Sequence, residues 1–182
     1  GSHTLVIEGS SKLHGADHNI ISDPIEAGTF ILLAHATKSN LTIKNVEAEY
    51  LTLFFKRLKD FGFPYEFSDP STLVTYPWNS AIIDRIQTLP HPGIATDLQS
   101  AFGVLATQTK GATLLHDPLY EGRLKYLEEL NQMGADVIFC DPHRAIINGP
   151  TPLYGTSIAS YDLRGGAALV IAGLVAHGKT AI

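Results

Sequence analysis

The fold is decided by residues 97–109, DLQSAFGVLATQT, in which one aspartate is followed by a stretch without any charge. Apolar residues recur at intervals of three and four between Leu98 and Ala106, which is the period of an α-helix with one buried stripe. A helix with so little polarity is expected to be buried on most sides. Asp97 stands where a helix N-cap belongs, so its carboxylate is predicted to accept the first backbone N–H groups.

The same pattern occurs twice more along the chain. Helices are predicted after Asp23 and after Asp162, and the three helices lead into predicted strands at 41–43, 113–115 and 180–182. The stripe predicted to be buried in the third helix consists of Leu163, Gly166, Ala167, Val170, Ile171 and Leu174. In the first two copies a second amphipathic helix follows, closed by Gly62 or Gly134. A hairpin then turns at Phe-x-Asp-Pro, residues 67–70 and 139–142.

We therefore predict an α/β fold made of repeated βαβαββ units, each ordered strand, helix, strand, helix, hairpin. The helices are expected inside and the sheets outside, with pseudo-threefold symmetry. The repeats span about 4–79, 80–150 and 151–182, and the third is incomplete. Residues 1–3 look like an expression scar, so 4–182 are taken as one domain. The alternative is an ordinary α/β sandwich in which the similarity arises by chance.

Composition excludes several classes of function. A net charge of −5 disfavours a broad nucleic-acid or anionic-lipid surface. No apolar run reaches the roughly 18 residues of a membrane span, and no signal-peptide pattern opens the chain. The single cysteine, Cys140, excludes an internal disulfide and fits a reducing compartment, so we expect a cytoplasmic protein that binds neither membrane nor nucleic acid.

Several longer strings resemble the enolpyruvyl transferase family, and most closely the branch that acts on UDP-N-acetylglucosamine. The strings are IEAGTF at 25–30, HPGIATDLQ at 91–99, EELNQMGAD at 128–136, DLR at 162–164 and AGLVA at 172–176. They occur in the same order as in the family, and the resemblance covers essentially the whole chain after residue 3. The resemblance implies the fold with buried helices and outer sheets.

The resemblance also implies an activity, carried by a domain that we expect to be inactive by itself. An enolpyruvyl group would pass from phosphoenolpyruvate to the 3-hydroxyl of UDP-N-acetylglucosamine, with release of phosphate, as in peptidoglycan precursor synthesis in bacteria. Asp97 would be the general base that accepts the proton of the hydroxyl, and Leu119, Arg123 and Arg164 would contact substrate. A companion domain of the same enzyme would supply a reactive cysteine and phosphate-binding basic residues. No cofactor and no metal are implied.

Three positions depart from the family pattern: Pro24 and Gly122 stand where Arg and Asn are usual, and Ala95 where Pro is usual. These departures keep two alternatives open, a non-catalytic binding or assembly module and transfer to a different acceptor. By the residues alone, a plain helix cap is the better explanation of Asp97, and only the resemblance favours a catalytic role.

Two further patterns are set aside. Residues 173–180 match the phosphate-loop pattern G-x-x-x-x-G-K-T, but a helix is predicted before them instead of a strand. His14, Asp17 and His18 form a tight cluster, yet zinc normally requires four ordered ligands, so we expect exposed loop histidines.

Overall fold

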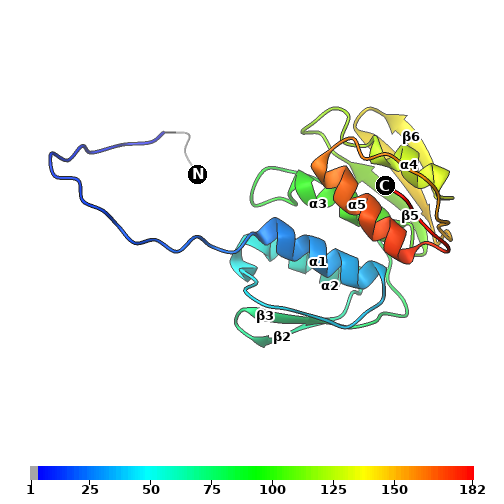
Figure 1. Ribbon diagram of the computed structural model, residues 1–182, viewed down its shortest axis with the longest axis horizontal. Coiled ribbons are helices and arrows are strands. Elements are labelled where there is room, and N and C mark those ends of the chain that lie inside the picture. Colours follow the sequence, from blue (N-terminus) through cyan, green and yellow to red (C-terminus); the bar gives the residue numbers. More distant parts are fainter. Residues whose placement is uncertain (1–3) are drawn as a thin grey trace.

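The computed structural model describes residues 4–182 and places three apolar helices at the centre of the molecule (Figure 1). Helices α1, α3 and α5 pack against one another, and the two β-sheets lie on the outside of this group. This confirms the predicted arrangement of buried helices and outer sheets. The elements are α1 (Pro24–Ala36), β1 (Leu41–Ile43), a 3-10 turn η1 (Ala48–Leu51), α2 (Thr52–Phe61), β2 (Tyr65–Asp69), β3 (Thr72–Thr75), β4 (Arg85–Gln87), α3 (Thr96–Ala106), β5 (Gly111–His116), α4 (Tyr126–Gln132), β6 (Asp136–Asp141), β7 (Arg144–Gly149) and α5 (Leu163–Val175).

The two sheets share a three-stranded antiparallel arrangement, and the second has one additional strand. One has the antiparallel order β1-β3-β2, and the other has the order β4-β5-β7-β6, in which β4 runs parallel to β5. The β2–β3 hairpin shifts register between Phe67 and Asp69, and the β6–β7 hairpin does so between Phe139 and Asp141. An irregularity at the same place in both Phe-x-Asp-Pro hairpins supports the predicted repeat.

Helix α3 is the most deeply buried element. Every residue from Leu98 to Ala106 is buried. The neighbouring α1 approaches it closely at Gly28, where an added Cβ would lie 2.8 Å from a methyl carbon of Leu98. Glycine at this crossing allows the two nearly uncharged helices to pack closely, because no side chain at that position holds their backbones apart.

Four local predictions are wrong. Asp97 is not an N-cap: Ala95 holds that position, and Asp97 lies in the first turn of α3, where its carboxylate meets two arginines. In α5, Leu163, Val170 and Leu174 of the stripe predicted to be buried are exposed. Periodicity could not predict this, because a helix with apolar residues on all faces has no polar side that marks its exposed face. Residues 180–182 form only an isolated bridge, and Cys140 lies in β6 instead of in the hairpin turn.

The segment before α1 differs from the prediction as well. Residues 4–22 contain no regular secondary structure and extend away from the helices (Figure 1), although a strand was expected to open the first repeat. None of the described helices is long and apolar enough to cross a bilayer.

His35 gives the folded protein a predictable pH dependence. Its ring is fully buried against Phe63, and neither ring nitrogen has a hydrogen-bond partner within the described residues. Burial lowers its pKa to about 4. The unfolded chain therefore takes up a proton near pH 6.5 that the folded chain excludes, so stability falls as the pH drops from about 6.5 to 4, by roughly 3 kcal/mol.

Urea unfolding at pH 7.5 and pH 4.5 tests this expectation. His35→Leu should remove most of the pH-dependent loss, whereas His14→Leu, which changes an exposed histidine, should leave it intact. An identical pH dependence in the wild type and His35→Leu would contradict the prediction.

Candidate functional site

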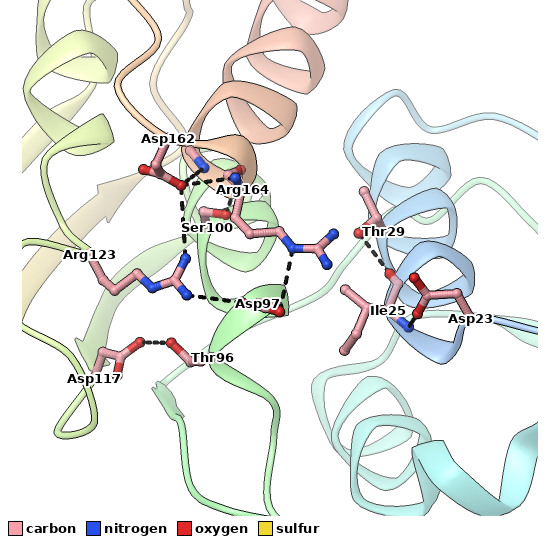
Figure 2. A network of polar contacts seen from close by, with 11 residues as sticks. Asp23, Ile25, Thr29, Thr96, Asp97, Ser100, Asp117, Arg123, Asp162 and Arg164 are labelled. Atoms are coloured by element: carbon pink, nitrogen blue, oxygen red, sulfur yellow. Dashed lines mark hydrogen bonds and ion pairs between the residues drawn. The ribbon is translucent and has the colours of Figure 1, made fainter.

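Two aspartates and two arginines meet where α3 and α5 begin beside the loop that follows β5 (Figure 2). A guanidinium nitrogen of Arg123 lies 3.1 Å from Asp97 Oδ1, and its other terminal nitrogen lies 3.8 Å from Asp162 Oδ1. Arg164 Nε lies 3.5 Å from Asp97 Oδ2. All four side chains are one quarter to two fifths exposed, so a ligand can reach them.

Asp97 is the centre of this cluster. It stands in the first turn of α3, where the partial positive charge of the helix N-terminus favours a carboxylate. Each of its oxygens faces one arginine, yet a carboxylate has about four lone-pair sites. Asp97 can therefore accept a further hydrogen bond, for example from a substrate hydroxyl, without giving up either arginine.

Asp162 and Arg164 are placed by the start of α5. Asp162 is the N-cap, and its Oδ1 accepts hydrogen bonds from the backbone N–H groups of Arg164 and Gly165 at 2.9 and 2.8 Å. The Ser100 hydroxyl of α3 donates to the Arg164 carbonyl oxygen at 2.9 Å. The start of α5 is thereby fixed against α3, which keeps Arg164 within reach of Asp97.

The loop after β5 is held by a buried carboxylate. Asp117 is fully buried, its Oδ2 accepts a hydrogen bond from the Thr96 hydroxyl, and its Oδ1 accepts one from the Leu119 backbone N–H at 3.1 Å. The Arg123 guanidinium lies 5.2 Å from the centre of the Tyr120 ring, a cation–π distance. These contacts join the loop to the first residue of α3, next to Asp97.

An open groove of about 400 Å³ adjoins the cluster. Asp97 and Leu119 both line it, together with Leu89, Pro90, His91, Ala95, Thr96 and Tyr120. The structure thus brings together all four residues singled out from the sequence, since Arg123 and Arg164 contact the Asp97 that lines the groove. Their roles in binding and catalysis stay predictions.

Sequence reasoning missed part of the site. Asp162 was expected only as a helix cap, and Asp117, Thr96, Ser100 and Tyr120 were not singled out. The signal for Asp117 was available, because a polar residue directly after an apolar strand marks the strand end where sites commonly form.

The three departures from the family pattern lie around this site. Pro24 occupies the first position of α1, which tolerates proline, and Ala95 is the N-cap of α3. Both line a smaller hollow of about 210 Å³. Gly122 has a φ of 76°, in the left-handed region that glycine and asparagine adopt most readily, so the change removes an amide without altering the turn.

The charges of the cluster balance. Two carboxylates face two guanidinium groups, so the four side chains sum to zero. An anionic ligand must compete with Asp97 and Asp162 for the arginines, and we expect this domain alone to bind a phosphate group weakly.

The cap and ion-pair roles of Asp162 can be separated by two substitutions. Asp162→Ala removes both hydrogen bonds to the start of α5 and should cost about 1–2 kcal/mol of unfolding free energy. Asp162→Asn keeps an amide oxygen that can cap the helix and loses only the partly exposed pair with Arg123, so it should cost less than about 1 kcal/mol. Urea unfolding measures both, and equal losses would contradict the capping role.

The phosphate-loop match is excluded by its structural context. Gly173 lies within α5, and Gly178, with a φ of 93°, follows the end of that helix. A phosphate loop follows a strand, whereas a helix leads into this match. The helix predicted before the match is confirmed.

Comparisons with known proteins agree on one group of enzymes. The model of a family described as EPSP synthase (3-phosphoshikimate 1-carboxyvinyltransferase) matches residues 1–182. UDP-N-acetylglucosamine 1-carboxyvinyltransferase of Gloeobacter violaceus is 40% identical over 182 residues, which is all of this chain and 39% of that protein. The protein of the same name from Bacteroides thetaiotaomicron is 40% identical over 191 aligned residues, covering all of this chain and 44% of that protein.

Solved structures show the same fold. The enolpyruvyl transferase NikO from Streptomyces tendae matches 86% of this chain with a TM-score of 0.77 and 22% identity, over 37% of its own length. An EPSP synthase from Acinetobacter baumannii matches 90% of this chain with a TM-score of 0.64 and 14% identity, over 39% of its own length. The chain spans about two fifths of the length of the relatives it matches.

Proposed function

Since the chain belongs to the EPSP synthase family of 1-carboxyvinyltransferases, we propose that it is part of an enzyme acting on UDP-N-acetylglucosamine. The enzyme would transfer an enolpyruvyl group from phosphoenolpyruvate to the 3-hydroxyl of the sugar and release phosphate. The choice of acceptor is supported by the names of relatives that are 40% identical over the whole chain. Such a reaction on soluble nucleotide sugars fits a cytoplasmic protein.

The observation that carries the proposal is the position of Asp97. A carboxylate with lone pairs to spare lines an open groove and is held between two arginines. We propose that Asp97 accepts the proton of the attacking hydroxyl as the new C–O bond forms. A position near the hydroxyl would also orient the sugar for attack.

Arg123 and Arg164 are proposed to contact the nucleotide sugar, whose diphosphate suits guanidinium groups. Leu119, which lines the groove from the opposite loop, would pack against an apolar face of the ligand. Because the cluster has no surplus positive charge, the enolpyruvyl donor needs further cations. We therefore propose that a companion domain of the same enzyme supplies them and closes the groove.

Ligand titration followed by NMR tests the acceptor. UDP-N-acetylglucosamine should shift the amide signals of Leu119, Arg123 and Arg164 at millimolar concentration. Shikimate 3-phosphate, the acceptor of EPSP synthase, should not shift them. Arg123→Ala should weaken these shifts, whereas Arg144→Ala, which removes an exposed arginine of β7, should not. Stronger shifts with shikimate 3-phosphate would overturn the choice of acceptor.

Activity is tested in a fusion. The chain alone should release no phosphate from UDP-N-acetylglucosamine and phosphoenolpyruvate, whereas a fusion to the remaining segment of a relative should. The departures at Pro24, Ala95 and Gly122 favour the alternative of a non-catalytic module. A folded fusion that binds the nucleotide sugar but never releases phosphate would support that alternative, and phosphate release with another acceptor alone would support transfer to that acceptor.

A further inference from the structure

A second hollow opens between the start of α1, the residues of η1 and α2, and the loop that precedes α3. Its volume is about 210 Å³. Leu51, Phe54, Ile94 and Leu98, each at most 5% exposed, form its buried wall. Among the described residues that line it, none carries a carboxylate, an ammonium or a guanidinium group. The hollow therefore suits an apolar group and disfavours phosphate or carboxylate.

This hollow adjoins the groove that Asp97 lines. His91 and Ala95 line both spaces, and Leu98, which lines the hollow, directly follows Asp97 in α3. The side chain of Ile25, which also lines the hollow, lies on the side of α1 that faces Asp97 (Figure 2). A ligand bound at Asp97 therefore has the hollow as its neighbour.

The loop between the two spaces is fixed by its own backbone. The Leu89 N–H donates to the Ile94 carbonyl oxygen at 3.0 Å, and the Gly93 N–H donates to the Pro90 carbonyl oxygen at 2.8 Å. Gly93 is packed so closely that an added Cβ would lie 2.4 Å from the Leu89 Cβ. A wall held in this way keeps its shape when a ligand arrives, so the hollow is largely preformed.

Two departures from the family pattern widen the hollow and keep it uncharged. Pro24 lines it where arginine is usual, and Ala95 lines it where proline is usual. An arginine at 24 would bring a guanidinium group to this space, and a proline ring at 95 would occupy more of it than the alanine methyl group does. Ala95 has a φ of −61°, which proline adopts readily, so the backbone does not account for the alanine.

We propose that the hollow receives the acyl chain of a 2-acylamino nucleotide sugar, so that the acceptors include sugars whose acyl chain is longer than acetyl. This inference rests on the proposed transfer to the 3-hydroxyl of such a sugar. The acylamino group at C2 is next to that hydroxyl, whereas the diphosphate is anionic and separates the uridine from it. A cavity of about 150 Å³ holds a molecule the size of benzene, so about 210 Å³ has room for an acyl chain of about three to five carbons.

Titration of the chain with two nucleotide sugars, followed by NMR, tests the proposal. UDP-N-butanoylglucosamine has two more methylene groups than UDP-N-acetylglucosamine, and burial of each is expected to strengthen binding about fourfold. Its Kd should therefore be about tenfold lower, and it should shift the methyl signals of Ile94 and Leu98 further. Equal Kd values would overturn this proposal and leave the proposed acceptor standing. Absence of binding by both compounds would overturn the proposed acceptor, and this inference with it.

Leu53→Trp places a larger side chain in the hollow and leaves the groove unchanged, because Leu53 lines only the hollow. The variant should bind the acetyl compound as the wild type does, which also shows that it is folded, and should lose the advantage of the butanoyl compound. Leu174→Trp, at an exposed position of α5, is the control and should keep that advantage.

Pro24→Arg is a second, independent variant at the first position of α1, and it should also reduce the advantage of the butanoyl compound severalfold. If both Leu53→Trp and Pro24→Arg kept the full advantage, the added carbon atoms would lie outside the hollow and the proposal would be wrong.

Discussion

Asp97→Asn is expected to lower kcat of an active fusion by a factor of about 10² to 10⁴, which is the usual contribution of a positioned general base. The amide keeps the size of the side chain and can still accept hydrogen bonds from Arg123 and Arg164, so the fold of the cluster should persist. What it loses is the ability to take a proton from the sugar hydroxyl. Steady-state phosphate release at saturating substrates measures this effect.

Asp23→Asn is the matched control for this substitution. Asp23 caps α1 by accepting a hydrogen bond from the Ile25 N–H, and among residues 4–182 no ion pair joins it to either arginine of the cluster. Asparagine caps helices equally well. This variant should keep kcat within about a factor of three of the parent. A similar small change for Asp97→Asn would show that Asp97 is not the base.

Phe102→Ala is expected to be the most destabilising single substitution among those considered, at about 3–5 kcal/mol. Phe102 is fully buried in α3, and its ring meets the Phe54 ring edge-on at a centroid distance of 5.6 Å. Removing it leaves a cavity between α2 and α3 that rigid neighbouring helices cannot fill. Urea unfolding by circular dichroism measures the loss.

Phe30→Ala provides the comparison on α1. Phe30 is 44% exposed, so its removal should lower the free energy of unfolding by less than about 1.5 kcal/mol. The m value, the slope of the unfolding free energy against urea concentration, should stay unchanged for both variants. Equal losses at the two positions would contradict the assignment of α3 as the centre of the core.

Most of the architecture followed from local patterns. Gly62 and Gly134 have φ values of 88° and 103°, as expected for residues that end a helix in the left-handed region. The Phe-x-Asp-Pro turns predicted both hairpins, because turn chemistry acts within a few residues. The exposed side of α5 could not be predicted, because Leu163, Val170 and Leu174 differ from the buried residues only in what lies opposite them.

The site was predicted less completely than the fold. Asp97, Leu119, Arg123 and Arg164 could be singled out only by their match to a family pattern, since nothing in the local sequence distinguishes Asp97 from the capping residues Asp23 and Asp162. Their convergence depends on how α3, α5 and the loop after β5 pack. The same packing brings in Asp117, whose partners Thr96 and Leu119 are distant from each other in the chain.

The amino-acid sequence by itself determined the repeats, the nearly uncharged helices and the turns, because these depend on periodicity and backbone preference over short stretches. Only the tertiary structure decided that Asp97 would face two arginines instead of capping its helix, and that β1 would pair only with β3 among the described residues 4–182. Both depend on contacts between residues far apart in the chain, where geometry, and no local preference, selects the partner.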